Sequence, residues 1–185
     1  MKRISLLFTI FVICFATLTQ AQTAAPKPDP EIQKMSMFAG HWKYEGEVKP
    51  TPVGPLAPGK YKSEWFGEMT LGGFFFERRV KGSGPGFDYE RLDVYWYDPA
   101  IKSLTYADYL NNGHVDSGVF EVTGNVYTVR WKETAGGKDY QMRATYTLAR
   151  DGLSMDYKMD YSPDGQTWTT SGEGKAVKFE PAANK

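Results

Sequence analysis

Residues 153–161 read Leu153-Ser-Met-Asp-Tyr-Lys-Met-Asp-Tyr161, which is the most regular stretch of the chain. Apolar and polar side chains alternate there with a period of two, the pattern of a β-strand that buries one face. The apolar set consists of Leu153, Met155, Tyr157, Met159 and Tyr161. The polar residues between them are costly to bury, so the sequence predicts that they face water and that the apolar set, Leu153 included, faces the interior.

The preceding segment, 138–149, shows the same alternation. Its apolar positions are Tyr140, Met142, Ala144, Tyr146 and Leu148. The connection between the two segments contains Asp151-Gly152, a pair typical of the tight turn in a β-hairpin. Hairpin partners are neighbours in a sheet, so we expect the two apolar sets to form one continuous wall.

Comparable segments fill most of the chain between residues 41 and 179. Eight further strands are predicted at 41–49, 60–69, 71–81, 87–98, 101–110, 114–123, 126–134 and 166–179. Turn signals such as Asn112-Gly113 and Gly124-Asn125 join several of them, and Gly72-Gly73 suggests a turn or bulge. Residues 50–59 hold four prolines and two glycines, which favour a long loop.

A short helix is expected before the strands. Asp29 can cap it, Pro30 suits its first position, and Ile32, Met35 and Phe38 then share one face. No helical pattern follows residue 40. Short connections and one apolar face favour an all-β, antiparallel, up-and-down barrel of about ten strands, because closure removes the exposed edges of the sheet.

Length and charge exclude several classes of protein. The 185 residues suit one domain, and 22 basic side chains balance 22 acidic ones. Loss of an N-terminal segment containing Lys2 and Arg3 would leave a net charge of −2. This balance argues against nucleic-acid binding, which depends on clustered Lys and Arg. After residue 21, no segment has the ~20 apolar residues that span a bilayer.

The N-terminus is typical of a secretory signal peptide. Lys2 and Arg3 precede the apolar segment 4–16, and Thr19-Gln20-Ala21 is a small-x-small cleavage signal. We therefore expect a signal peptide at 1–21, a flexible tether at 22–30, and one barrel domain at 31–180 in a secreted or periplasmic protein. Cys14, the sole cysteine, leaves with the signal, so the mature chain has no disulfide and no thiol nucleophile.

The helix followed by Gly40-x-Trp42 resembles the calycin group, which includes lipocalins and fatty-acid-binding proteins. The segments 38–42, 71–75 and 95–99, followed by 101–108, resemble more specifically the bacterial family called domain of unknown function 1579. The resemblance covers roughly residues 31–179. It implies a calycin-like barrel with a cavity for a small apolar ligand, and it implies no activity. It also implies that Trp42 plugs one end under a basic side chain, Lys175 or Lys178, where lipocalins have arginine.

His41 and His114 are the only histidines, and a neutral imidazole can bind haem iron or zinc. Some calycin relatives bind haem through one histidine, which makes His114 a weak candidate iron ligand. Its position after the Asn-Asn-Gly turn equally suits an exposed residue at the barrel rim. His41 should face outward if Trp42 faces inward. We expect no metal site and no cofactor.

The acidic residues show no spacing that would bring two of them together for catalysis. Asp93 and Asp116 are expected on the solvent face, and no catalytic residue is predicted. Arg78 and Arg79 are adjacent in a strand, so one of them should point inward. A buried arginine needs a carboxylate partner, which could be an acidic ligand or, as the more favoured alternative, an ion pair with Glu77 or an aspartate.

Aromatic and methionine side chains give the main indication of binding, because they line adaptable apolar pockets. The candidate interior residues are Tyr44, Trp65, Arg78, Tyr146, Met155, Tyr157 and Met159. The same residues would equally fill a solid barrel. Three functions therefore remain open: non-catalytic binding of a small, partly apolar molecule, a haem-dependent enzyme of the calycin type, and a filled barrel that acts as an interaction module.

Overall fold

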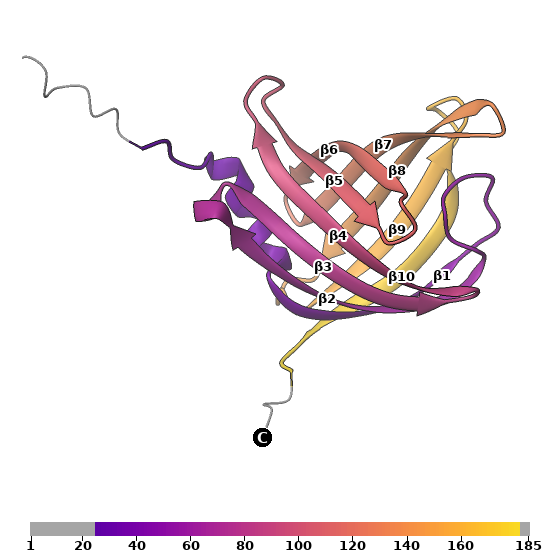
Figure 1. The fold of residues 1–185 in the computed structure, drawn as a ribbon, viewed down its shortest axis with the longest axis horizontal. Helices are drawn as coiled ribbons and strands as arrows, with labels where there is room; N and C mark the ends of the chain where they lie inside the picture. Colours follow the sequence, from indigo (N-terminus) through magenta and orange to yellow (C-terminus); the bar gives the residue numbers. More distant parts are fainter. Residues whose placement is uncertain (1–24, 182–185) are drawn as a thin grey trace, which may run out of the picture.

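The computed structural model describes residues 25–181, which form a closed antiparallel barrel of ten strands (Figure 1). In chain order they are β1 (Gly40–Val48), β2 (Gly59–Thr70), β3 (Phe75–Gly84), β4 (Phe87–Asp98), β5 (Ser103–Leu110), β6 (Val115–Thr123), β7 (Val126–Ala135), β8 (Lys138–Leu148), β9 (Ser154–Ser162) and β10 (Thr169–Phe179). Each strand pairs with its neighbours in sequence, and β10 closes the barrel on β1. The meander confirms the predicted fold class.

Several strands begin later than the sequence pattern indicates. Leu71–Gly73 form a short 3-10 turn, η2, in which Gly72 and Gly73 have φ values of 71° and 88°, so the glycine pair does mark a turn. Leu153 lies in the β8–β9 turn and is 57% exposed, so its predicted interior position is wrong. The carboxylate of Asp151 accepts a hydrogen bond from the Leu153 N–H at 2.9 Å, which extends the turn by one residue.

A 3-10 helix, η1 (Pro30–Phe38), lies across one end of the barrel (Figure 1). The Asp29 side chain accepts a hydrogen bond from the Glu31 N–H at 2.9 Å, and Pro30 occupies the first helical position, as the sequence predicts. Ile32, Met35 and Phe38 are all buried. The helix therefore presents one apolar face to the barrel and closes that end.

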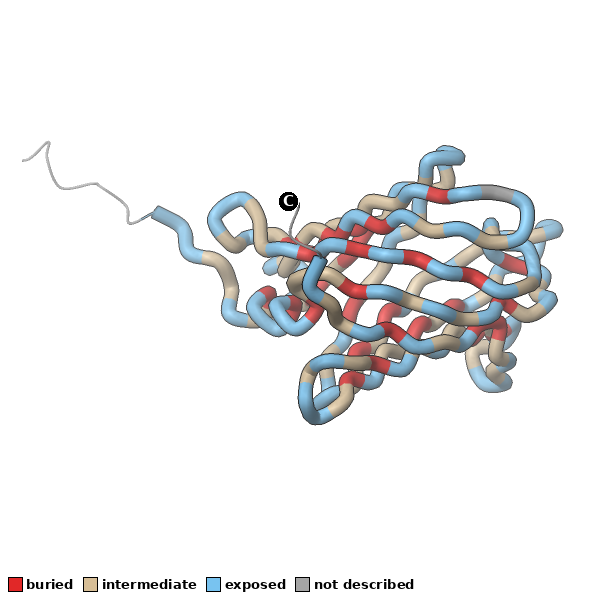
Figure 2. The backbone as a smooth tube through the Cα atoms, turned by 90° about the horizontal axis from the view of Figure 1, so that it is seen from below, coloured by how far each residue is buried: buried red, intermediate tan, exposed pale blue. Residues whose placement is uncertain are grey.

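Burial alternates along the strands, as Figure 2 shows by the change from buried to exposed positions. The inward side chains of all ten strands form one core together with η1. Within residues 25–181, no helix is long and apolar enough to cross a bilayer. The expected signal peptide and residues 22–24 of the expected tether lie outside the described residues.

A candidate ligand-binding cavity

The end of the barrel next to η1 is packed solid. Trp42 is fully buried and stacks on Trp65 with ring centroids 5.7 Å apart. Lys178 Nζ lies 5.5 Å from the centre of the Trp42 ring, whereas Lys175 is exposed on the outer wall. Phe38 of η1 inserts between aromatic rings of the strands, 4.9 Å from the Tyr127 centroid. Trp42 thus occupies the position that the resemblance implies for a plug.

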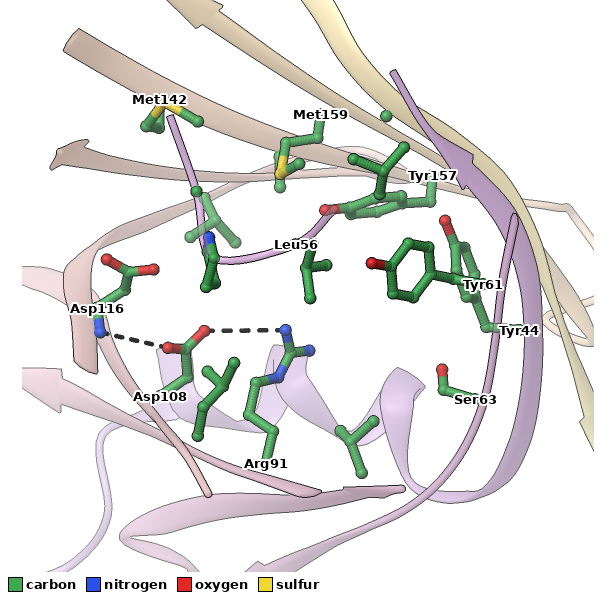
Figure 3. A pocket seen from close by; sticks show the side chains of 18 of the residues that line it. Tyr44, Leu56, Tyr61, Ser63, Arg91, Asp108, Asp116, Met142, Tyr157 and Met159 are labelled. Carbon is green, nitrogen blue, oxygen red and sulfur yellow. Dashed lines mark hydrogen bonds and ion pairs between the residues drawn. The ribbon is translucent and has the colours of Figure 1, made fainter. Parts of the chain in front are cut away.

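A cavity of about 150 Å³ lies between this packed end and the opposite mouth (Figure 3). All seven interior residues predicted from the sequence line it: Tyr44, Trp65, Arg78, Tyr146, Met155, Tyr157 and Met159. In Figure 3, Met142 and Met159 lie on one side of the space, and the hydroxyls of Tyr44 and Tyr157 border it. The volume holds several water molecules, so the barrel is filled at one end and hollow toward the other.

Two glycines leave room for the ring of Tyr44. Gly46 and Gly174 face each other across β1 and β10, and the Tyr44 side chain lies against both. A Cβ added at Gly174 would stand 2.5 Å from the Glu45 carbonyl oxygen and 2.5 Å from Tyr44 Cε2. The bare backbone at these positions lets the tyrosine lie along the wall instead of projecting across the cavity.

The proline-rich loop 49–58 covers the mouth. Its residues Val53 and Leu56 line the cavity, and Val53 is only 3% exposed. Figure 3 shows Leu56 pointing into the space between the walls. The Tyr61 hydroxyl donates a hydrogen bond of 2.8 Å to the Ala57 carbonyl, which ties the end of the loop to β2. A ligand entering from this side would have to pass the loop.

A buried ion pair lies deep in the cavity wall. Arg78 Nε donates to Asp93 Oδ2 at 2.5 Å, and both side chains are at most 5% exposed. Arg79 points outward to Glu77, at 3.1 Å. The inward arginine therefore pairs with an aspartate of the protein, as the favoured alternative predicted. The expected solvent position of Asp93 is wrong, because Asp93 lies directly opposite Arg78 on the neighbouring strand.

A second arginine extends this pair toward the mouth. Arg91 Nε lies 2.8 Å from Asp93 Oδ1, and Arg91 Nη1 lies 4.0 Å from Asp108 Oδ2. The Asp116 N–H donates to Asp108 Oδ1 at 3.3 Å (Figure 3). Burial raises the pKa of Asp108 to about 6. Arg91 opposes this rise, and repulsion from the carboxylates of Asp93 and Asp116 adds to it.

Three potential metal ligands meet at the rim. His114 Nε2 lies 3.1 Å from Asp116 Oδ2, and one ligand atom each from His114, Asp116 and Glu133 lie within 4.8 Å of one another. Trp131 Nε1 donates to Glu133 Oε1 at 2.9 Å, and burial raises the pKa of Glu133. Asp116 lines the cavity, so its expected solvent position is also wrong. His41 is on the outer wall, 4.7 Å from the Phe66 ring, as predicted.

The polar side of the cavity was not predicted from the sequence. Arg91, Asp108, Asp116 and Glu133 line it, and Asp93 pairs with Arg91 in the wall. The signal was present, because Asp93 and Arg91 share the parity of Tyr95, and Asp108 shares that of Tyr106. An unpaired buried charge is costly, which disfavours an inward position for a charged residue. The cross-strand arginines remove part of that cost.

Comparison with known proteins supports the fold and nothing finer. No protein-family model and no curated protein matches the chain. Among solved structures, the crystal structure of Rv2717c from M. tuberculosis is similar, with a TM-score of 0.55. The match has 14% sequence identity and covers 83% of this chain and 100% of that one. At this identity the likeness shows a shared barrel architecture.

Proposed function

We propose that this protein binds a small, partly apolar molecule inside the barrel without chemical conversion. The observation that carries the proposal is the cavity itself, which combines aromatic rings and flexible methionines with a few polar groups. Its volume of about 150 Å³ is below the ~300 Å³ expected of a typical ligand pocket, so the proposed ligand is small. A barrel that served only as a rigid module would gain stability by filling this space, since an empty cavity costs contacts. The packed end supplies that rigidity already.

Tyr157 is the test position for this proposal. It lines the cavity from β9, while its neighbour Lys158 is exposed on the outer wall. Tyr157→Ala should weaken the binding of an environment-sensitive apolar dye about tenfold or more, and Lys158→Ala should leave it unchanged. Fluorescence titration of the two variants and the wild type gives the comparison. Equal dye binding by all three proteins, or binding by none, would favour the filled barrel.

The proposal includes the compartment and the family. Secretion or export to the periplasm, with removal of residues 1–21, is supported by the signal-peptide pattern. N-terminal sequencing of the exported protein should begin at Gln22 or within a few residues of it, and a mature protein that starts at Met1 would refute processing. Membership of the family called domain of unknown function 1579 rests on the short motifs around Trp42, Phe74 and Trp96.

The two histidines favour binding over haem chemistry. His114 Nε2 faces the Asp116 carboxylate, and His41 packs on the outer wall against Phe66 and Phe179. An iron ligand needs a free nitrogen lone pair that points into the cavity. A Soret band after reconstitution with haem, lost in His114→Ala, is the result that would restore the haem-enzyme alternative.

A further inference from the structure

A row of carboxylates crosses the inner wall below the mouth. Asp93, Asp108 and Asp116 are direct cross-strand partners on β4, β5 and β6. Glu133 of β7 continues the row, with a carboxylate oxygen within 4.8 Å of one on Asp116. Like charges directly opposite each other destabilise a sheet, so this arrangement needs a compensating positive charge.

The protein supplies only part of that charge. Arg78 and Arg91 both make their closest carboxylate contacts with Asp93, at 2.5 and 2.8 Å. The closest arginine contact to the rest of the row is the 4.0 Å separation of Arg91 and Asp108. Three carboxylates at the mouth therefore share one arginine that is already paired. His114 lies 3.1 Å from Asp116, and Arg91 lies 4.0 Å from Asp108, so within the described residues Glu133 has no ion-pair partner in this half-buried region.

Aromatic rings stand beside the carboxylates. Trp131 and Tyr106 line the same cavity and meet edge to face, with centroids 6.3 Å apart. The face of an aromatic ring attracts a cation, and tryptophan does so most strongly. Met142 and Met159 supply apolar surface in the same cavity. The carboxylates and rings thus attract a cation, and the methionine side of the cavity accommodates an apolar body.

A separate observation comes from the deep end. Trp65 lines the cavity and is 6% exposed, and its indole Nε1–H has no hydrogen-bond partner among the described residues. A buried donor without a partner is unfavourable by about 1–3 kcal/mol. An acceptor atom on a bound molecule would satisfy it.

Building on the ligand-binding function proposed above, we infer that the ligand is an organic cation. Its ammonium group lies among Asp108, Asp116 and Glu133, its apolar body contacts Met142 and Met159, and an acceptor atom reaches the Trp65 N–H. A bare metal ion fits less well, because His114 Nε2 already faces Asp116 and a metal would leave the Trp65 donor and the apolar walls unused.

Three probe molecules of similar shape test whether the cavity prefers a positively charged head group. The probes are 4-methoxyphenethylamine, the corresponding alcohol 2-(4-methoxyphenyl)ethanol, and the acid 3-(4-methoxyphenyl)propionate, each titrated into the wild-type protein by calorimetry at pH 7.5. All three carry an aromatic body and an ether oxygen, and they differ in the charge of the head group. We expect the amine to bind at least tenfold more tightly than the alcohol, and the acid to bind least.

Paired variants locate the cation. Asp108→Asn and Glu133→Gln should each weaken the amine at least fivefold and leave the alcohol within twofold. Asp156→Asn and Glu121→Gln remove carboxylates from the outer wall and should change neither probe. Thermal melts of all four variants show whether each is folded. The comparison of the three probes on the wild-type protein does not depend on the variants.

The outcomes separate this inference from the proposed function. Equal binding of amine and alcohol, or tightest binding of the acid, would overturn the inference that the ligand is a cation. The proposed ligand-binding function would still stand. Binding of none of the three probes and of no apolar dye would overturn both. A third outcome is that Zn²⁺ or Mn²⁺ binds, that this binding is lost in Glu133→Gln, and that the amine does not bind. The site would then be a metal site and not a site for an organic cation.

Discussion

The two ends of the barrel are built from the same kind of strand, but one end is packed solid and the other encloses a cavity. Beside η1, bulky rings fill the interior completely, and Trp42 is fully buried. At the mouth, glycines stand opposite each other on β1 and β10, and charged residues cross the inner wall. The packed end stabilises the fold through buried apolar area. The mouth contains a cavity and buried charges, which lower stability and are therefore features that selection for stability alone would remove.

Trp42 should show the largest effect, because it anchors the packed end. Trp42→Ala should lower the free energy of unfolding by about 3–5 kcal/mol, as loss of a large aromatic core side chain does. Denaturant melts measure the loss, with the exposed Leu71→Ala as a control that should change stability by under about 0.5 kcal/mol. A loss below about 1 kcal/mol for Trp42→Ala would mean that this end is not the stabilising one.

Two glycines on β10 sharpen the comparison at the mouth. Gly174→Ala should destabilise the protein by about 1–3 kcal/mol, because the new Cβ would meet backbone and the Tyr44 ring at 2.5 Å. Gly172→Ala is the matched control for stability on the same strand, since its Cβ would have no neighbour nearer than 3.5 Å. Ligand or dye binding should also fall in the Gly174 variant, because Tyr44 lines the cavity. Equal losses of stability at the two positions would show that the Gly174 backbone is not needed to seat Tyr44.

Asp108 should give a smaller effect that depends on pH. Its folded-state pKa of about 6 lies above its ordinary value of 3.8, because burial and the facing carboxylates of Asp93 and Asp116 outweigh the facing Arg91. As pH rises from 4 to 6, the unfolded chain releases this proton first, so stability falls. Relative to Asp108→Asn, the wild type should lose on the order of 1–3 kcal/mol across this window.

Denaturant melts at pH 4, 5, 6 and 7 on the wild type, Asp108→Asn and Asp156→Asn measure this dependence. Asp156 is exposed on the outer wall, so Asp156→Asn should follow the wild type throughout. Parallel pH curves for the wild type and Asp108→Asn would show that Asp108 keeps an ordinary pKa. Such a result would remove the electrostatic difference between the two ends.

Much of the fold could be predicted from the sequence because the signals are local. Alternation at 153–161 and turn pairs such as Asp151-Gly152 specify strands and hairpins between neighbours in the chain. Six inward aromatic and methionine side chains followed from parity and residue type, whereas parity left open which of Arg78 and Arg79 points inward. The inward positions of Asp93 and Asp116 did not follow, because charged side chains ordinarily face water and the sequence does not show their cross-strand partners.

The sequence by itself determined the all-β class, the meander and the alternation of faces, since each depends on residues close together in the chain. Only the tertiary structure decided which inward groups meet. The register places Arg78 opposite Asp93 and Asp108 opposite Asp116, and the packing of successive hairpins brings Glu133 to the same row. Cavity size was likewise a tertiary outcome, because it depends on how rings such as Tyr44 lie against glycines of another strand.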